Sequence, residues 1–108
     1  MIKIALVSFS REVADEVAQC YSSLPDTPEE IKMLDTYVFN EEGKDIKAFS
    51  IFEYDEAYED IMVKYLKTRY EAFHKIPNLK STIENWLRVS DAFAILKAGG
   101  DFDATFSI

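Results

Sequence analysis

Two stretches of this chain carry apolar side chains on both of their alternating faces. In residues 2–9, IKIALVSF, and in residues 46–54, IKAFSIFEY, apolar residues occupy odd and even positions alike. A strand with two apolar faces usually lies in the centre of a sheet, where both faces are covered. The stretch between them, residues 31–39, carries Lys32 and Asp35 and is more typical of an edge strand. We therefore expect the first and third of these strands to be central.

Helical periodicity predicts two main helices, one in residues 11–22 and a longer one in residues 56–74. Ser10 and Asp55 precede them as candidate N-cap residues. Acidic residues crowd the start of the longer helix and basic residues its end, which complements the helix dipole. The turn NEEGKD at 40–45 joins the second and third strands as a hairpin.

The last part of the chain gives a weaker pattern. Residues 79–88 fit a strand, although their apolar residues would also share one face of a helix. The next segment favours the strand, because Ser90 is a candidate N-cap for a short helix over 91–98 that ends at Gly99. The stretch DFDATFSI at 101–108 alternates strictly and predicts a further strand.

The order strand, helix, strand, strand, helix, strand is that of the ferredoxin-like βαββαβ fold. We predict an α+β protein with a four-stranded antiparallel sheet, two main helices on one face, a short extra C-terminal helix and a tail strand. Residues 1–98 would form a single ferredoxin-like domain. Residues 99–108 would be a C-terminal tail that serves as an edge strand or is exchanged between subunits.

Two helices cover only one face of a four-stranded sheet. The other face would expose apolar side chains to water, at a cost of about 25 cal/mol per Å². A second copy packed sheet against sheet would remove that cost. We therefore predict a homodimer through the open sheet face.

Composition narrows the function classes. Twelve Lys and Arg residues against twenty Asp and Glu give the chain of 108 residues a net charge of -8, which disfavours nucleic acid and anionic membranes as partners. No apolar run approaches the roughly 20 residues of a membrane span. The single cysteine, Cys20, permits no internal disulfide. We expect a cytoplasmic protein.

The element order and the doubly apolar sheet resemble the dimeric α/β-barrel superfamily, over about residues 1–98. That superfamily includes antibiotic-biosynthesis-type monooxygenases, haem-degrading monooxygenases and muconolactone isomerases. The resemblance implies a pocket for a small apolar molecule between sheet and helices. It does not imply a haem site. This chain has Ser8 and Ser10 on the first strand, where the haem-degrading members carry an asparagine. Its histidine and tryptophan also occur in the reverse order along the chain, since His74 comes before Trp86. We expect no cofactor.

Four residues are candidates for the mouth of such a pocket: Tyr37, Tyr65, His74 and Trp86. His74 is also a weak candidate for a catalytic base, since its unperturbed pKa is about 6.5. Structural roles compete with each assignment. His74 would cap the end of the longer helix, Trp86 would be a core or interface anchor, and the tyrosines would pack in the core.

Three functional hypotheses follow. The first is a homodimer that binds a small apolar or aromatic molecule. The second is a cofactor-independent monooxygenase or isomerase, and the third is a protein-protein interaction module. We expect no metal site, because the acidic clusters lack the ligand spacing of a calcium loop.

Overall fold

The computed structural model describes residues 1–99. The strand predicted for 101–108 falls outside the described residues. Within them, the elements follow in the order β1 (Ile2–Phe9), α1 (Ala14–Ser22), β2 (Ile31–Phe39), β3 (Ile46–Tyr54), α2 (Glu59–Tyr70), β4 (Lys80–Trp86) and α3 (Val89–Lys97). Short 3₁₀ turns, η1 (Arg11–Val13), η2 (Glu56–Tyr58) and η3 (Ala72–Lys75), flank the first two helices.

The strands form one antiparallel sheet in the order β2-β3-β1-β4. The prediction of an α+β protein with a four-stranded antiparallel sheet is confirmed, and the described residues contain three helices. The expectation that the two-faced strands are central is also confirmed, since β1 and β3 lie inside the sheet and β2 and β4 at its edges. None of the helices in the described part of the chain is long and apolar enough to span a bilayer.

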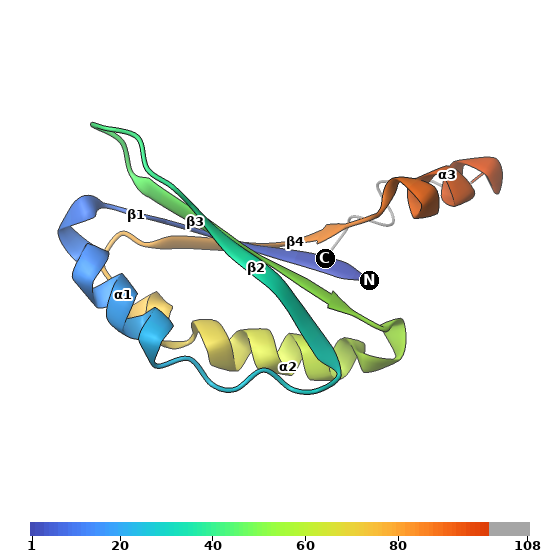
Figure 1. The fold of residues 1–108 in the computed structure, drawn as a ribbon, viewed down its shortest axis with the longest axis horizontal. Coiled ribbons are helices and arrows are strands. Elements are labelled where there is room, and N and C mark those ends of the chain that lie inside the picture. The colour runs from blue at the N-terminus through green and yellow to red at the C-terminus, as the bar shows by residue number, and fades with distance from the viewer. Residues whose placement is uncertain (100–108) are drawn as a thin grey trace.

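Helices α1 and α2 lie against the same face of the sheet (Figure 1). Side chains at alternate positions of the central strands are buried beneath them: Lys3, Ala5, Val7 and Phe9 of β1, and Ala48, Ser50, Phe52 and Tyr54 of β3. The helices contribute Val17, Met62 and Leu66 to the same core. The opposite face of the sheet carries no helix of the described residues.

The longer helix differs from its prediction. It does not run unbroken from 56 to 74, because α2 itself ends at Tyr70 and the chain continues as η3. In a 3₁₀ turn the side chains at i and i+3 point the same way. This geometry buries both Phe73 and Ile76 in the core. Asp55 caps the start as predicted, since its carboxylate accepts a hydrogen bond from the backbone N–H of Ala57 at 2.9 Å.

The C-terminal part is partly as predicted. Residues 80–86 form a strand, and Gly99 follows α3 with φ of 77° while its N–H donates to the carbonyl of Leu96. The N-cap assignment of Ser90 was wrong. Helix α3 begins two residues earlier, at Val89, because Arg88 takes the extended conformation and its carbonyl accepts from the N–H of Ala92.

Helix α3 has a different environment from α1 and α2. It projects beyond the end of the sheet, away from α1 and α2 (Figure 1). None of its residues is buried, and its apolar side chains Val89, Phe93 and Leu96 are each more than half exposed. The helix therefore contributes little to the core of this chain.

Candidate functional site

Two of the four predicted site residues lie on the open face of the sheet. Tyr37 is on β2 and is 51% exposed, and Trp86 is on β4 and is 49% exposed. The Tyr37 ring packs against Phe49, with ring centroids 5.1 Å apart. Strands β3 and β1 separate the two residues, because β2 and β4 are opposite edges of the sheet.

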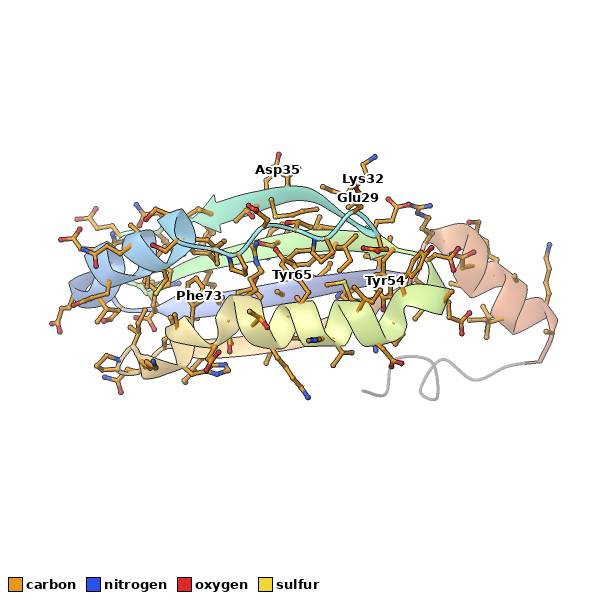
Figure 2. The ribbon with its side chains drawn as sticks, turned by 90° about the horizontal axis from the view of Figure 1, so that it is seen from below. Glu29, Lys32, Asp35, Tyr54, Tyr65 and Phe73 are labelled. Carbon is orange, nitrogen blue, oxygen red and sulfur yellow. The ribbon has the colours of Figure 1, made fainter. Side chains whose placement is uncertain are left out.

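Tyr65 lies on the other face, buried between α2 and the sheet (Figure 2). Its hydroxyl accepts a hydrogen bond from Arg69 Nη1 at 3.0 Å and shares another with Thr27 Oγ1 at 3.0 Å. The ring packs edge-on against Phe52. Tyr65 is therefore a core residue that ties α2 to the loop before β2.

His74 is exposed and belongs to η3, beyond the end of α2. Its Nε2 atom is 3.4 Å from Ser81 Oγ at the beginning of β4. His74 lines a groove between α2 and β4. The other three predicted site residues do not line this groove. The four residues predicted for the mouth of one pocket do not lie together. Tyr37 and Trp86 lie on the open face of the sheet, and Tyr65 is buried on the face covered by the helices.

The groove beside His74 has a volume of about 230 Å³. Its walls are mostly apolar and come from α2 on one side and from β1 and β4 on the other. It is lined by Lys3, Val63, Leu66, Lys67, Tyr70, His74, Ser81 and Ile83. An apolar cavity of about 150 Å³ is enough to bind benzene, so this groove has room for a molecule with one aromatic ring.

Lys3 provides a buried cation in the lining of the groove. It is 3% exposed, and its Nζ atom lies 2.9 Å from Glu59 Oε1 and 2.6 Å from Asn85 Oδ1. The other carboxylate oxygen of Glu59 accepts a hydrogen bond from the hydroxyl of Tyr54. A lysine ammonium has three donors, and these two contacts use two of them. The Nζ atom also lies over the ring of Tyr54, 5.8 Å from the ring centroid.

The same network fixes the charges of its members. Partial burial opposes ionisation of Glu59, but hydrogen bonds from Tyr54 and Lys3 and the positive charge of Lys3 lower its pKa. Burial, together with the hydrogen bond to Glu59 and the negative charge there, raises the pKa of Tyr54. At neutral pH the network therefore contains an ionised carboxylate and a protonated phenol.

Lys3 is not among the residues that the sequence pattern predicted for a site. A lysine in a strand is usually taken as exposed, although Lys3 shares its parity with the apolar residues Ala5, Val7 and Phe9. That shared parity was the signal, since alternate residues of a strand face the same side. Its partner Glu59 looked like an ordinary acidic residue at a helix start.

A second buried cation lies deeper in the core. Arg69 is 3% exposed and packs over the rings of Phe52 and Tyr70, at 5.2 and 5.5 Å from their centroids. Its guanidinium donates to the hydroxyls of Tyr65 and Tyr70. Among the described residues no carboxylate is within salt-bridge distance of it. Arg69 therefore organises the aromatic core rather than an ion pair.

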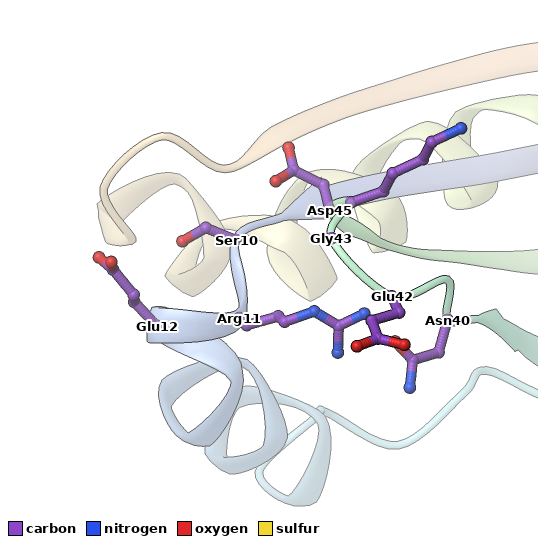
Figure 3. A pocket seen from close by; sticks show the side chains of 8 residues that line it. Ser10, Arg11, Glu12, Asn40, Glu42, Gly43 and Asp45 are labelled. Carbon is purple, nitrogen blue, oxygen red and sulfur yellow. The ribbon is translucent and has the colours of Figure 1, made fainter.

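A larger polar groove lies where β1 meets η1, beside the β2–β3 turn (Figure 3). It has a volume of about 710 Å³ and is wide open to solvent. Arg11 crosses it and donates from Nη2 to the carbonyl oxygen of Glu41 at 2.5 Å. Its lining mixes acidic and basic side chains without a buried polar group, so we do not assign it a ligand. Within residues 1–99 no three His, Cys, Asp or Glu side chains are grouped as metal ligands would be.

No protein-family model matches the chain, and no curated protein matches it. Among solved structures, the aminopeptidase PepT from Bacillus cereus ATCC 10987 matches with 11% sequence identity and a TM-score of 0.42. The match covers 92% of this chain and 35% of the aminopeptidase. A likeness this low carries no conclusion about the fold or the activity of the chain.

Proposed function

We propose that the chain is a ferredoxin-like homodimer that binds a small aromatic or apolar molecule in the groove between α2 and β4. The observation that carries the ligand proposal is the chemistry of the groove. Apolar walls from Val63, Leu66 and Ile83 meet the buried side chain of Lys3 in the lining of one groove. Apolar walls with a few placed polar groups are typical of small-molecule sites.

The lining defines the class of ligand. Because the groove holds about 230 Å³, one ring fits better than two fused rings with substituents. Lys3 offers a donor and a positive charge, so the ligand carries an acceptor such as a hydroxyl, a carbonyl or a carboxylate. A cationic group is disfavoured beside Lys3.

The ferredoxin-like fold and the relation to the dimeric α/β-barrel superfamily belong to the same proposal. The strand order, with β1 and β3 in the centre, supports them. The homodimer is supported by the open face of the sheet, where Phe39, Phe49 and Trp86 are each more than a third exposed. Exposed large apolar side chains on an uncovered sheet face are typical of an interaction site.

A second candidate function is proton transfer without a cofactor, as in an isomerase or a cofactor-independent monooxygenase. The position of His74 at the groove favours it, because a histidine there is within reach of a bound molecule. Turnover that disappears in His74→Asn while binding persists would support this activity over binding alone. The interaction-module hypothesis is favoured instead by the exposed apolar stripe of α3.

Titration of the ¹⁵N-labelled protein with phenol, benzoate and benzylamine tests the ligand proposal. We expect phenol and benzoate to shift amide resonances of groove residues, and benzylamine to shift them much less. Val63→Trp should block binding by filling the groove. Ile61→Trp is the matched control, because Ile61 is similarly exposed on α2 and does not line the groove. Equal binding to both tryptophan variants, or no shifts at the groove with any compound, would contradict the proposal.

A further inference from the structure

The groove between α2 and β4 has two ends that differ in chemistry. Lys3 of β1 pairs in register with Asn85 of β4, and Val7 of β1 pairs with Ser81. Residues directly opposite one another in an antiparallel pair lie on the same face of the sheet. The strand rises about 13 Å from Ser81 to Asn85. Lys3 therefore lies at one end of the groove and Ser81 at the other, with Ile83 between them.

At the first end, the positive charge of Lys3 already has partners. Its Nζ atom lies 2.9 Å from Glu59 Oε1 and 2.6 Å from Asn85 Oδ1. It also lies over the ring of Tyr54. Because the Glu59 carboxylate is so close, an anionic ligand gains less at this end than it would gain beside a cation that has no carboxylate partner.

Such a cation, Lys67, lies toward the other end of the groove. It follows Glu59 by two helical turns of α2, which is about 12 Å along the helix axis. Its side chain is exposed and lines the groove. Lys67 forms no salt bridge with any described residue, including Glu71 one turn further along the chain. Its ammonium is therefore available to a ligand at the rim of the groove.

Two other donors lie at the same end. His74 Nε2 is 3.4 Å from Ser81 Oγ, and both residues line the groove. An imidazole N–H and a serine hydroxyl can each donate a hydrogen bond to a carboxylate oxygen. Together with Lys67 they give this end a set of donors from α2, η3 and β4.

The charge of the groove is opposite to that of the protein as a whole. The chain has a net charge of -8, yet no Asp or Glu from the described part of the chain lines the groove. A local positive potential of this kind favours anions. A small inorganic anion would use the cations and leave the apolar walls exposed to water. An aromatic carboxylate would use both the cations and the walls.

We infer that the preferred ligand of the groove is an aromatic carboxylate, whose carboxylate lies beside Lys67 and His74. Its ring then lies against the apolar walls, toward Val63 and Ile83. This inference rests on the proposed function and adds the charge of the ligand and its orientation. It makes Lys67 the residue that selects a carboxylate over a neutral group of the same shape.

Benzoate and benzamide test the selection, because they have nearly the same shape and differ in charge. We expect benzoate to bind the ¹⁵N-labelled wild type about fivefold more tightly than benzamide, as measured by titration of amide shifts. Lys67→Gln should weaken benzoate about fivefold and leave benzamide unchanged. Lys67→Arg keeps the charge and should keep the preference. Lys64→Gln is the matched control, because Lys64 is exposed on α2 and does not line the groove.

Intermolecular NOEs test the orientation of bound benzoate. We expect the ortho protons, next to the carboxylate, to show NOEs to the ring protons of His74. The para proton should show NOEs to the methyl groups of Val63. The reverse pattern would place the carboxylate at the Lys3 end and would overturn the inference.

The outcomes separate this inference from the proposed function. Equal affinities of the wild type for benzoate and benzamide, with shifts at groove residues, would overturn the selection and leave the groove as a binding site. A loss of benzoate affinity that is equal in Lys67→Gln and Lys64→Gln would show an effect of net charge and would also overturn it. An absence of groove shifts with benzoate, benzamide and phenol alike would overturn both the inference and the proposed function.

Discussion

Lys3 Nζ and Glu59 Oε1 lie 2.9 Å apart and connect β1 to the first turn of α2. The lysine side chain is almost fully buried, whereas the glutamate side chain is 39% exposed. The pair therefore lies at the boundary between core and solvent, beside the groove assigned to a ligand. Its chemistry links the stability of the fold to the binding of that ligand.

Replacing Lys3 by methionine should destabilise the protein, by about 2 kcal/mol in urea unfolding. The change removes the ammonium group that contacts Asn85 Oδ1 and Glu59 Oε1, and it leaves those two oxygens without their donor. The same variant should lose its preference for phenol over benzylamine. Lys64→Met is the control, since Lys64 is exposed on α2. A loss below about 0.5 kcal/mol would mean that the pair contributes as little as a surface ion pair.

Acid should weaken the fold through Glu59. Its pKa is lowered in the folded state by hydrogen bonds from Tyr54 and Lys3 that outweigh the opposing effect of burial. The unfolded state then binds more protons as the pH falls below the ordinary carboxyl pKa of about 4.3. The contribution is present above that pH and is lost as pH falls through the folded pKa. In urea unfolding between about pH 6 and 2, Glu59→Gln should lose less stability than the wild type. Parallel curves for the two proteins would contradict this assignment.

Removing the hydroxyl of Tyr21 should be neutral or stabilising. The hydroxyl oxygen is buried and has no hydrogen-bond partner among the described residues. Because Tyr21→Phe removes this unsatisfied polar group, it should raise the free energy of unfolding by up to about 1 kcal/mol. The ring still packs edge-on against Phe73 at 4.9 Å. Thermal unfolding measures the change. A destabilisation of more than about 1 kcal/mol would indicate that the hydroxyl has a partner.

Tyr21 should also titrate late in alkali. Burial, with the neighbouring Tyr70, raises its pKa to about 12. Stability from a protonated Tyr21 is fully present below the unfolded pKa of about 10 and is lost as pH rises toward 12. Absorbance at 295 nm should show a late-titrating phase that Tyr21→Phe reduces. A wild-type titration identical to that of the variant would refute the shift.

Arg69 should not be replaceable by lysine. Its guanidinium donates to two tyrosine hydroxyls and packs over two aromatic rings, which a compact ammonium group cannot do at once. We expect Arg69→Lys to lose about 2 kcal/mol in chemical unfolding and Arg69→Met a similar amount. Full stability in the lysine variant would show that charge alone is sufficient.

Much of the fold followed from strand periodicity. The two apolar faces of β1 and β3 predicted their central positions, because period-2 alternation decides which face each side chain joins. The polar residues Lys32 and Asp35 likewise identified β2 as an edge strand. The break after α2 was harder to predict, since the 3₁₀ turn depends on burying Phe73 and Ile76 together.

The candidate site could be predicted only in part. Residues chosen for their rarity or aromatic character, such as Tyr37 and Trp86, lie on the open face rather than at the groove. His74 lines the groove because the segment after α2 meets the next strand there, and its role at a site stays a prediction. Lys3 and Glu59 were missed since their pairing depends on a contact between segments that are far apart in sequence.

The most direct test of the proposed function is an isotope-filtered NOE experiment on the phenol complex. We expect NOEs from the phenol ring protons to the methyl groups of Val63, Leu66 and Ile83, which line the groove. NOEs to Leu6 and Phe49 on the open face instead, or no intermolecular NOE at saturating phenol, would contradict it.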